Sequence, residues 1–176
     1  MTGLTVAVVL IAVLTLFNLF VLLGVIRRLR TMTAAENEPL PGTLPEVGRR
    51  VGPFALTSVD GGTVTEADLA DGQSVVLLLS STCLPCQGTA VQLAKNPAEL
   101  PQRTYVFLRG DDNDAERDNM LETLAGVGTI ATFDDVGGIG VAFGANGYPT
   151  ALLVEDGVVA AASFKYAEVL PDRVSA

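Results

Sequence analysis

The sequence of 176 residues predicts an α/β domain built on a mixed central sheet, and three observations predict it. Residues 75–80 and 104–108 are continuous apolar runs, which are typical of strands buried on both faces. Residues 86–96 and 114–124 follow these runs and carry the spacing or end signals of helices. Residues 151–161 hold two apolar runs around a Glu-Asp-Gly turn, which predicts a β-hairpin. Helices that alternate with buried strands and end in a hairpin indicate a mixed sheet flanked by helices.

Turn and capping residues predict the other elements. Asp60-Gly61-Gly62 is typical of a tight turn between two short strands, and Thr65 is a suitable helix N-cap. Asn96-Pro97 ends the helix that begins at Cys86. In chain order these signals predict a strand at 54–59, its return at 63–64, a short helical turn at 66–69, a strand at 129–133 and a helix at 136–143.

The N-terminal stretch from Leu4 to Ile26 carries no formal charge. About 23 residues at ~1.5 Å each reach ~35 Å, which is enough to cross the ~30 Å hydrocarbon core of a bilayer. A cleaved signal peptide is the rival interpretation, but the stretch is too long and has no basic residue before it. We therefore expect residues 1–30 to be a transmembrane anchor with a basic flank, its span at about 4–26.

Residues 31–48 form the next segment, which contains three prolines and three glutamates. Such a composition favours an extended linker that buries no core. The rest of the chain, residues 49–176, has the length of one ordinary domain and shows no internal repeat.

Composition excludes several classes of function. The chain has no His, so a Ser-His-Asp triad, a Cys-His pair and a His-ligated metal or haem are excluded. It has two Cys, too few for a four-cysteine zinc or iron–sulfur site, and we expect neither a metal nor a cofactor. The net charge is −9 and every acidic residue lies at Glu36 or later, which argues against a nucleic-acid partner.

Cys83-Leu84-Pro85-Cys86 lies where a predicted buried strand meets a predicted helix. Two intervening residues at a helix start bring the sulfur atoms close enough to bond. The helix N-terminus favours the thiolate of Cys83, because unpaired N–H groups and the positive end of the dipole lie there. Pro85 fits the first helical turn, where a missing N–H costs nothing. Two other interpretations stay open: a zinc half-site completed by a second chain, and a purely structural disulfide.

Gly147-Tyr148-Pro149-Thr150 precedes the predicted hairpin. An X-Pro bond after Gly suits the cis form, which is tolerated mainly at proline. A cis bond would present the backbone of Tyr148 to an extended partner segment beside the disulfide. A trans proline that starts a strand is the alternative.

The order of these motifs resembles the thioredoxin superfamily: a strand, a C-x-P-C turn, a helix, and later Tyr148-Pro149-Thr150 before a hairpin. The opening at 54–64 and the anchor ahead of it resemble the TlpA/ResA branch, and within it the MauD-like proteins. The resemblance covers about residues 47–165 and implies a thioredoxin-like fold.

The resemblance also implies roles for individual residues. Cys83 is then the nucleophile, Cys86 the resolving cysteine, and Pro85 a residue that tunes the pair. Pro149 is then the cis-proline of a substrate groove. Tyr148, Thr82 and Leu84 complete the expected substrate contacts.

Two departures from the superfamily pattern concern the chemistry. Thr82 stands where these proteins usually have Trp, and Leu77 stands where many have a buried acid. No His lies between the two cysteines to stabilise a thiolate further, which favours a reductase or isomerase over a strong oxidant.

Together these features predict a membrane-anchored thiol-disulfide oxidoreductase that exchanges disulfides with protein partners and supports the maturation of exported proteins. The implied partners are a disulfide-containing protein, the lipid bilayer at Leu4–Ile26 and a membrane redox protein that supplies electrons. The implied location is the bacterial plasma membrane with the domain outside the cytoplasm. The basic residues Arg27, Arg28 and Arg30 follow the span, however, and favour a cytoplasmic domain.

Two other functions remain open at this stage. Ser80, three residues before Cys83, fits a thiol peroxidase of the peroxiredoxin type, although Cys86 lies unusually close for that class. A thioredoxin-fold scaffold that binds a partner without turnover is the other alternative.

Overall fold

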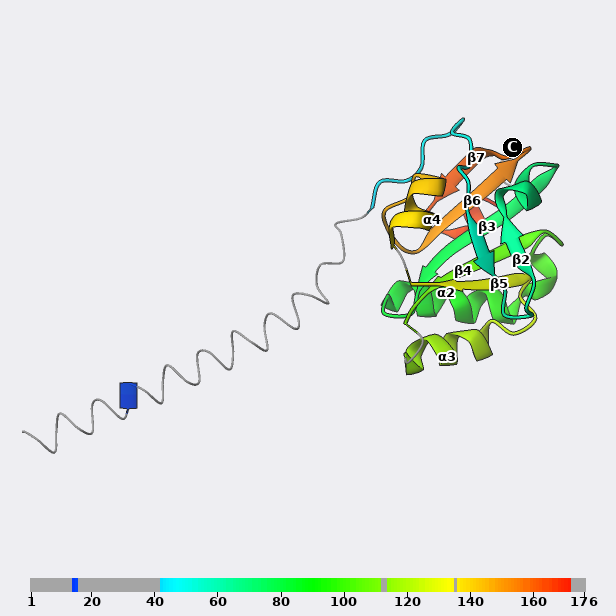
Figure 1. Ribbon diagram of the computed structural model, residues 1–176. Helices are drawn as coiled ribbons and strands as arrows, with labels where there is room; N and C mark the ends of the chain where they lie inside the picture. Colours follow the sequence, from blue (N-terminus) through cyan, green and yellow to red (C-terminus); the bar gives the residue numbers. More distant parts are fainter. Residues whose placement is uncertain (1–13, 16–41, 112–113, 135, 172–176) are drawn as a thin grey trace, which may run out of the picture. The chain divides into compact units, whose positions relative to one another are not determined.

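The computed structural model describes residues 14–15, 42–111, 114–134 and 136–171. The chain divides into two compact units, Met1–Pro39 and Leu40–Ala176, and the second holds the elements labelled in Figure 1. The predicted span at 4–26 lies outside the described residues, except for Leu14 and Thr15, and stays a prediction. Within the described ranges, no helix is both long and apolar enough to cross a membrane.

Five strands form one mixed sheet: β3 (Gln73–Ser80), β4 (Thr104–Arg109), β5 (Thr129–Phe133), β6 (Thr150–Glu155) and β7 (Val158–Ser163). Their order across the sheet is β5-β4-β3-β6-β7. Strands β3, β4 and β5 are parallel, whereas β6 is antiparallel to both β3 and β7. This arrangement confirms the predicted mixed sheet and places β3 at its centre.

Helices cover both faces of this sheet (Figure 1). Helices α2 (Leu84–Lys95) and α3 (Ala115–Thr123) pack on one face. Helix α4 (Val136–Phe143) and a separate hairpin, β1 (Ala55–Thr57) with β2 (Thr63–Thr65), pack on the other. Three 3-10 turns complete the described elements: η1 (Glu66–Leu69), η2 (Pro97–Glu99) and η3 (Tyr166–Glu168).

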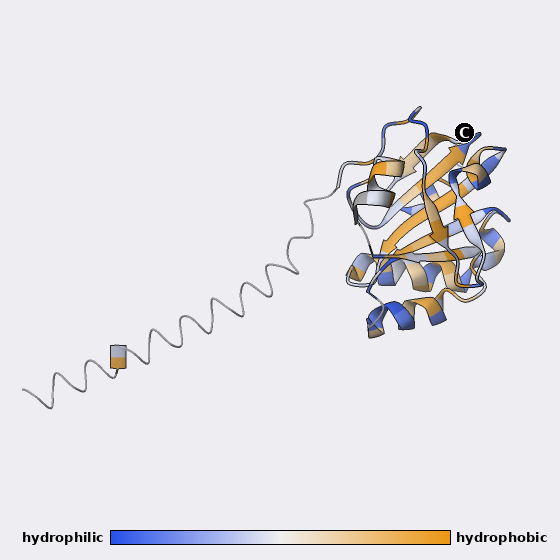
Figure 2. Cartoon of the chain, viewed as in Figure 1, coloured by the Kyte–Doolittle hydropathy of each residue, from blue (hydrophilic) through white to orange (hydrophobic). Residues whose placement is uncertain are grey.

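The continuous apolar run of β3 is explained by burial on both sides. Leu77 and Leu79 belong to the cluster under α2 and α3, whereas Val76 and Leu78 belong to the cluster under α4. Successive side chains of a strand point to opposite faces, so a strand covered on both faces needs apolar residues at every position. Figure 2 shows the same pattern, with hydrophobic central strands and a hydrophilic α3.

Two predicted boundaries differ from the structure. The strand predicted at 54–59 is only Ala55–Thr57, because the N–H of Phe54 donates to Glu66 Oε2 (3.1 Å) and Ser58 pairs with Ala131 of β5. The helix predicted from Cys86 begins at Leu84, because Cys83 caps it and Pro85 occupies its first turn.

The described part of the predicted linker packs on the domain. Gly42 and Pro45 are buried. The N–H of Gly48 donates to Val159 O (2.8 Å), and Arg50 pairs with Val158 in an antiparallel bridge. Residues 42–51, which we call the entry segment, therefore run beside β7 as part of the domain.

Candidate active site

The turn between β3 and α2 places Cys83 at the N-terminus of the helix. Cys83 is the N-cap residue, with extended backbone (φ −94°, ψ 110°), and its Sγ accepts the N–H of Cys86 at 3.3 Å. Its carbonyl accepts the N–H groups of Cys86 and Gln87 at 3.0 and 3.2 Å. The sulfur thus lies at the N-terminus of the helix, where an N–H donor and the positive end of the helix dipole stabilise negative charge.

Cys83 and Cys86 form a disulfide, with 5.2 Å between their Cα atoms. That separation lies within the usual range for disulfides. Both residues belong to the core cluster under α2, and they are 1% and 0% exposed. Both cysteines are therefore covered in this oxidised form.

Exposed side chains alternate with the buried cysteines along the motif. Leu84 is 76% exposed, and Thr82 and Pro85 are exposed too. The disulfide is therefore bordered by short polar and apolar groups that a partner protein can contact.

Residues 146–149, which we call the proline loop, lead into β6. The Tyr148–Pro149 peptide bond is cis, and Thr150 Oγ1 donates to the carbonyl of Gly147 at 2.8 Å. Strand β6 pairs antiparallel with β3, and Thr150 at the start of β6 lies opposite Leu78 near the end of β3. The loop therefore lies at the end of β3 from which the chain continues to the cysteines. Tyr148 packs against the cluster that contains both cysteines. The two motifs selected from the sequence therefore lie at the same end of the β3–β6 pair.

Burial raises the pKa of the Tyr148 phenol above its ordinary value of 10.0, while the positive charge of Arg109 acts in the opposite direction. The phenol is therefore neutral at physiological pH and can donate one hydrogen bond.

A hydrogen-bond network that sequence reasoning missed joins the cysteine turn to the starts of α2 and α3. The hydroxyl of Ser81 donates to the carboxylate of Asp114, and Gln87 Nε2 donates to the carbonyl of Ser81 at 3.0 Å. Asp114 also accepts the N–H of Glu116 at 3.0 Å as the N-cap of α3. The Ser81 hydrogen bond is the main reason that the pKa of Asp114 lies below its ordinary 3.8. No sequence signal connects residues 33 positions apart, so only the fold shows this link.

A small cavity of about 60 Å³ opens beside this network. The hydroxyl groups of Ser80 and Thr82 lie 3.2 Å apart on its wall, and Arg109 of β4 also lines it. The hydroxyl of Ser80 thus contacts Thr82 rather than a sulfur atom.

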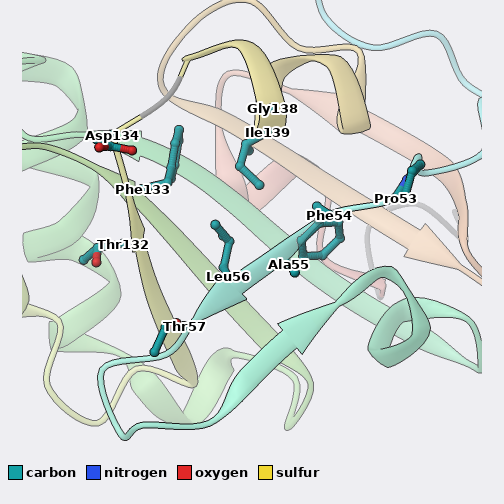
Figure 3. Close-up of a pocket in the computed structure, with 10 residues that line it drawn as sticks. All are labelled: Pro53, Phe54, Ala55, Leu56, Thr57, Thr132, Phe133, Asp134, Gly138 and Ile139. Carbon is teal, nitrogen blue, oxygen red and sulfur yellow. The ribbon is translucent and has the colours of Figure 1, made fainter.

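A larger cavity of about 380 Å³ lies between β1, β5 and the start of α4 (Figure 3). Phe54, Leu56, Phe133 and Ile139 supply much of its apolar wall, and Asp134 lies at one end. Neither cysteine lines it, and its apolar residues belong to the cluster on the opposite face of the sheet from α2. This cavity and the disulfide are therefore separate features.

Among the residues that the structure describes, no group of three or more His, Cys, Asp or Glu side chains is arranged to hold a metal ion. Both cysteines of the chain are bonded to each other, so neither is a free metal ligand in this form.

No family model and no curated protein matches this chain. Several solved structures, in contrast, are similar to it. The thioredoxin domain of a thiol-disulfide oxidoreductase from Bacteroides vulgatus aligns with 73% of this chain and 92% of its own, at 16% identity and a TM-score of 0.55. A DsbF homologue from Corynebacterium diphtheriae aligns with 74% and 87% at 14% identity and a TM-score of 0.53. A secreted Mycobacterium tuberculosis disulfide oxidoreductase, homologous to E. coli DsbE, aligns with 69% and 94% at 20% identity and a TM-score of 0.51.

These identities are too low to transfer an activity, but the alignments extend over most of each known domain. The described chain therefore has the thioredoxin fold, with a bonded cysteine pair at the start of α2 and a cis-proline before β6 at the same end of the β3–β6 pair.

Proposed function

We propose that the protein is a thiol-disulfide oxidoreductase that exchanges disulfides with protein partners through Cys83 and Cys86. The observation that carries the proposal is the disulfide itself, formed across one turn at the helix N-terminus of a thioredoxin fold. A disulfide that closes so short a loop adds little stability through chain entropy, so a structural role explains it poorly.

Two exchange steps transfer electrons to a partner disulfide. The Cys83 thiolate attacks one partner sulfur, a Cys83–partner disulfide forms, and the other partner sulfur leaves as a thiolate. Cys86 then loses its proton and attacks Cys83 Sγ, which releases the second partner sulfur. The protein dithiol is oxidised by two electrons to the Cys83–Cys86 disulfide, and the partner disulfide is reduced to two thiols. A dithiol donor, which we infer to be a membrane redox protein, restores the reduced form by the reverse exchange.

The surroundings of Cys83 support its role as the nucleophile. Its sulfur accepts an N–H from the first turn of α2, so its thiolate is stabilised, and Cys86 lies in the same buried cluster. Leu77 packs in the cluster that holds both, and no carboxyl group is buried among the described residues. The resolving step therefore has no buried acid–base group, which fits a reductase or isomerase with slow release of its mixed disulfide.

Partner binding is assigned to the groups that border the disulfide. Leu84, Thr82 and Pro85 are exposed on one side, and the proline loop with Tyr148 and Pro149 lies on the other. We infer that an extended partner segment lies along this loop, with an apolar side chain on Leu84.

We further propose that Leu4–Ile26 anchors the protein in the bacterial plasma membrane with the thioredoxin domain outside. An extracytoplasmic, oxidising compartment supports the proposal, because protein disulfides form there. A reporter fused to the C-terminus tests the orientation. Reporter activity confined to the cytoplasm would contradict it and would support the orientation favoured by the three arginines after the span.

A trapping experiment tests the function. In the full chain, Cys86→Ser leaves the nucleophile and removes the resolving thiol, so a stable mixed disulfide with a protein substrate is expected on non-reducing gels. Cys83→Ser is the matched control and should form none. Failure of the Cys86→Ser variant to capture a partner, together with no reduction of insulin disulfides by the wild-type chain, would contradict the proposal. A peroxide-consumption assay separates it from the peroxidase alternative.

A further inference from the structure

The entry segment touches the proline loop through two glycines. Gly42 and Gly147 are both buried, although 105 positions separate them in the sequence. A Cβ atom on Gly42 would lie 2.5 Å from both Cα and N of Gly147, and one on Gly147 would lie 2.7 Å from Cα of Gly42. Both distances are shorter than carbon and nitrogen atoms tolerate, so the two backbones are in direct contact and neither position has room for a side chain.

The entry segment cannot retreat easily from this contact, because its other end is fixed. The N–H of Gly48 donates to Val159 O (2.8 Å), and the N–H of Val159 donates to Arg49 O (2.8 Å). Arg49 Nη2 also donates to the carbonyl of Val141 in α4 at 3.1 Å. The segment is thus attached to β7 and to α4 before the chain enters β1.

The proline loop is fixed at both ends as well. The N–H of Ala145 donates to Gly140 O (2.9 Å) at the end of α4, and Thr150 Oγ1 donates to Gly147 O at the start of β6. Between these anchors, Gly147 contacts Gly42, and its neighbour Tyr148 packs against the cluster of the disulfide. A displacement of Gly147 therefore moves the backbone next to Tyr148, which packs on the cluster that includes both cysteines.

We propose that Gly42 is a positioning residue: its backbone contact with Gly147 sets where the proline loop lies, and thereby the shape of the groove that receives the partner chain. This inference rests on the proposed exchange with protein partners. Packed protein interiors transmit small displacements, and a shift of about 1 Å in a binding group can lower a rate by ~10²-fold. Gly42 acts through Tyr148 and Pro149 and does not itself touch the reacting sulfurs.

Gly42→Ala in the full chain, purified in detergent, tests the proposal with insulin as the disulfide substrate. The added methyl group would lie 2.5 Å from backbone atoms of Gly147, so one of the two backbones must shift. We therefore expect kcat/KM to fall about tenfold through a higher KM. The rate of Cys83 alkylation by iodoacetamide should stay within about twofold of wild type, because a small reagent does not use the groove. Thr43→Ala, at an exposed position of the same segment, is the matched control and should change neither quantity.

Pro45→Gly provides a second variant without a steric clash. It loosens the buried part of the entry segment and should raise KM in the same direction by a smaller factor. This variant decides the question if Gly42→Ala does not fold.

The outcomes separate the inference from the function on which it rests. A wild-type chain that does not reduce insulin contradicts the proposed function. An active wild type with unchanged KM in both variants contradicts the positioning role. An equal loss of kcat and of alkylation rate also contradicts it, because that result means general structural damage.

Discussion

The two halves of the candidate site are built in opposite ways. The hydrogen bonds made by Cys83 itself are local: its N–H donates to Ser80 O, and its sulfur accepts the N–H of Cys86. The proline loop is assembled over long distances in the chain, with Gly147 against Gly42 and Thr150 paired with Leu78. The comparison teaches that neighbours in the sequence position the reacting atoms, whereas long-range packing of the whole domain positions the surface that meets the partner.

The largest effect on activity is expected from a substitution in the cysteine turn. Replacing the nucleophile by Cys83→Ser should lower disulfide exchange by at least about 10³-fold, since the bond-forming atom is removed. Insulin reduction by the full chain measures it, with urea unfolding as a check on the fold. Substantial turnover in this variant would show that the cysteine turn does not carry the chemistry.

A substitution in the proline loop should lower the stability of the fold. Gly147→Ala places a methyl group 2.7 Å from Cα and 2.9 Å from N of Gly42. Because backbone rather than a flexible side chain is in the way, we expect a loss of about 1–3 kcal/mol in the free energy of unfolding. Urea denaturation measures it, and a stability equal to wild type would mean that the two backbones separate freely.

The hydrogen bond between Ser81 and Asp114 gives a pH-dependent contribution to stability. Ser81→Ala removes the hydrogen bond that lowers the pKa of Asp114, so this pKa should rise toward 3.8. A lowered pKa stabilises the fold above the ordinary pKa and ceases to do so as the pH falls through the folded-state value. The variant should therefore be less stable by about 1 kcal/mol at neutral pH, and the difference should shrink below pH 3.8. A difference independent of pH would contradict the assignment.

The smallest effect is expected from a second glycine-to-alanine substitution, this one in the helix that follows the cysteine turn. Gly88 lies exposed in α2, and a Cβ atom there would meet nothing within 4 Å. Because Ala is favoured over Gly inside a helix, Gly88→Ala should raise the free energy of unfolding by about 0.5–1 kcal/mol. The same chemical change thus has opposite signs in the two regions. A destabilised Gly88→Ala variant would break that contrast.

The same division explains what the sequence could predict. The buried runs of β3 and β4, the capped start of α2 and the hairpin of β6 and β7 follow from local periodicity and turn residues, and the structure has them. The cysteine pair could be identified because its chemistry needs only a fixed spacing at a helix start.

The parts that could not be predicted depend on distant contacts. Nothing near Ser81 in the sequence indicates its bond to Asp114. The prolines around Gly42 indicate an extended linker, but whether such a segment packs depends on the surface it meets, here Gly147 and β7. The expectation that Pro149 is a site residue comes only from the resemblance to the thioredoxin superfamily, because no local pattern places it at the same end of the sheet as the cysteines.

The most direct test of the account is a count of thiols after a single exchange. The fully reduced chain is mixed with an excess of a disulfide-containing peptide, quenched with acid, alkylated and weighed by mass spectrometry. The account predicts that Cys83 and Cys86 become protected from alkylation together while one peptide molecule gains two thiols. Two alkylated cysteines and an unchanged peptide would contradict it.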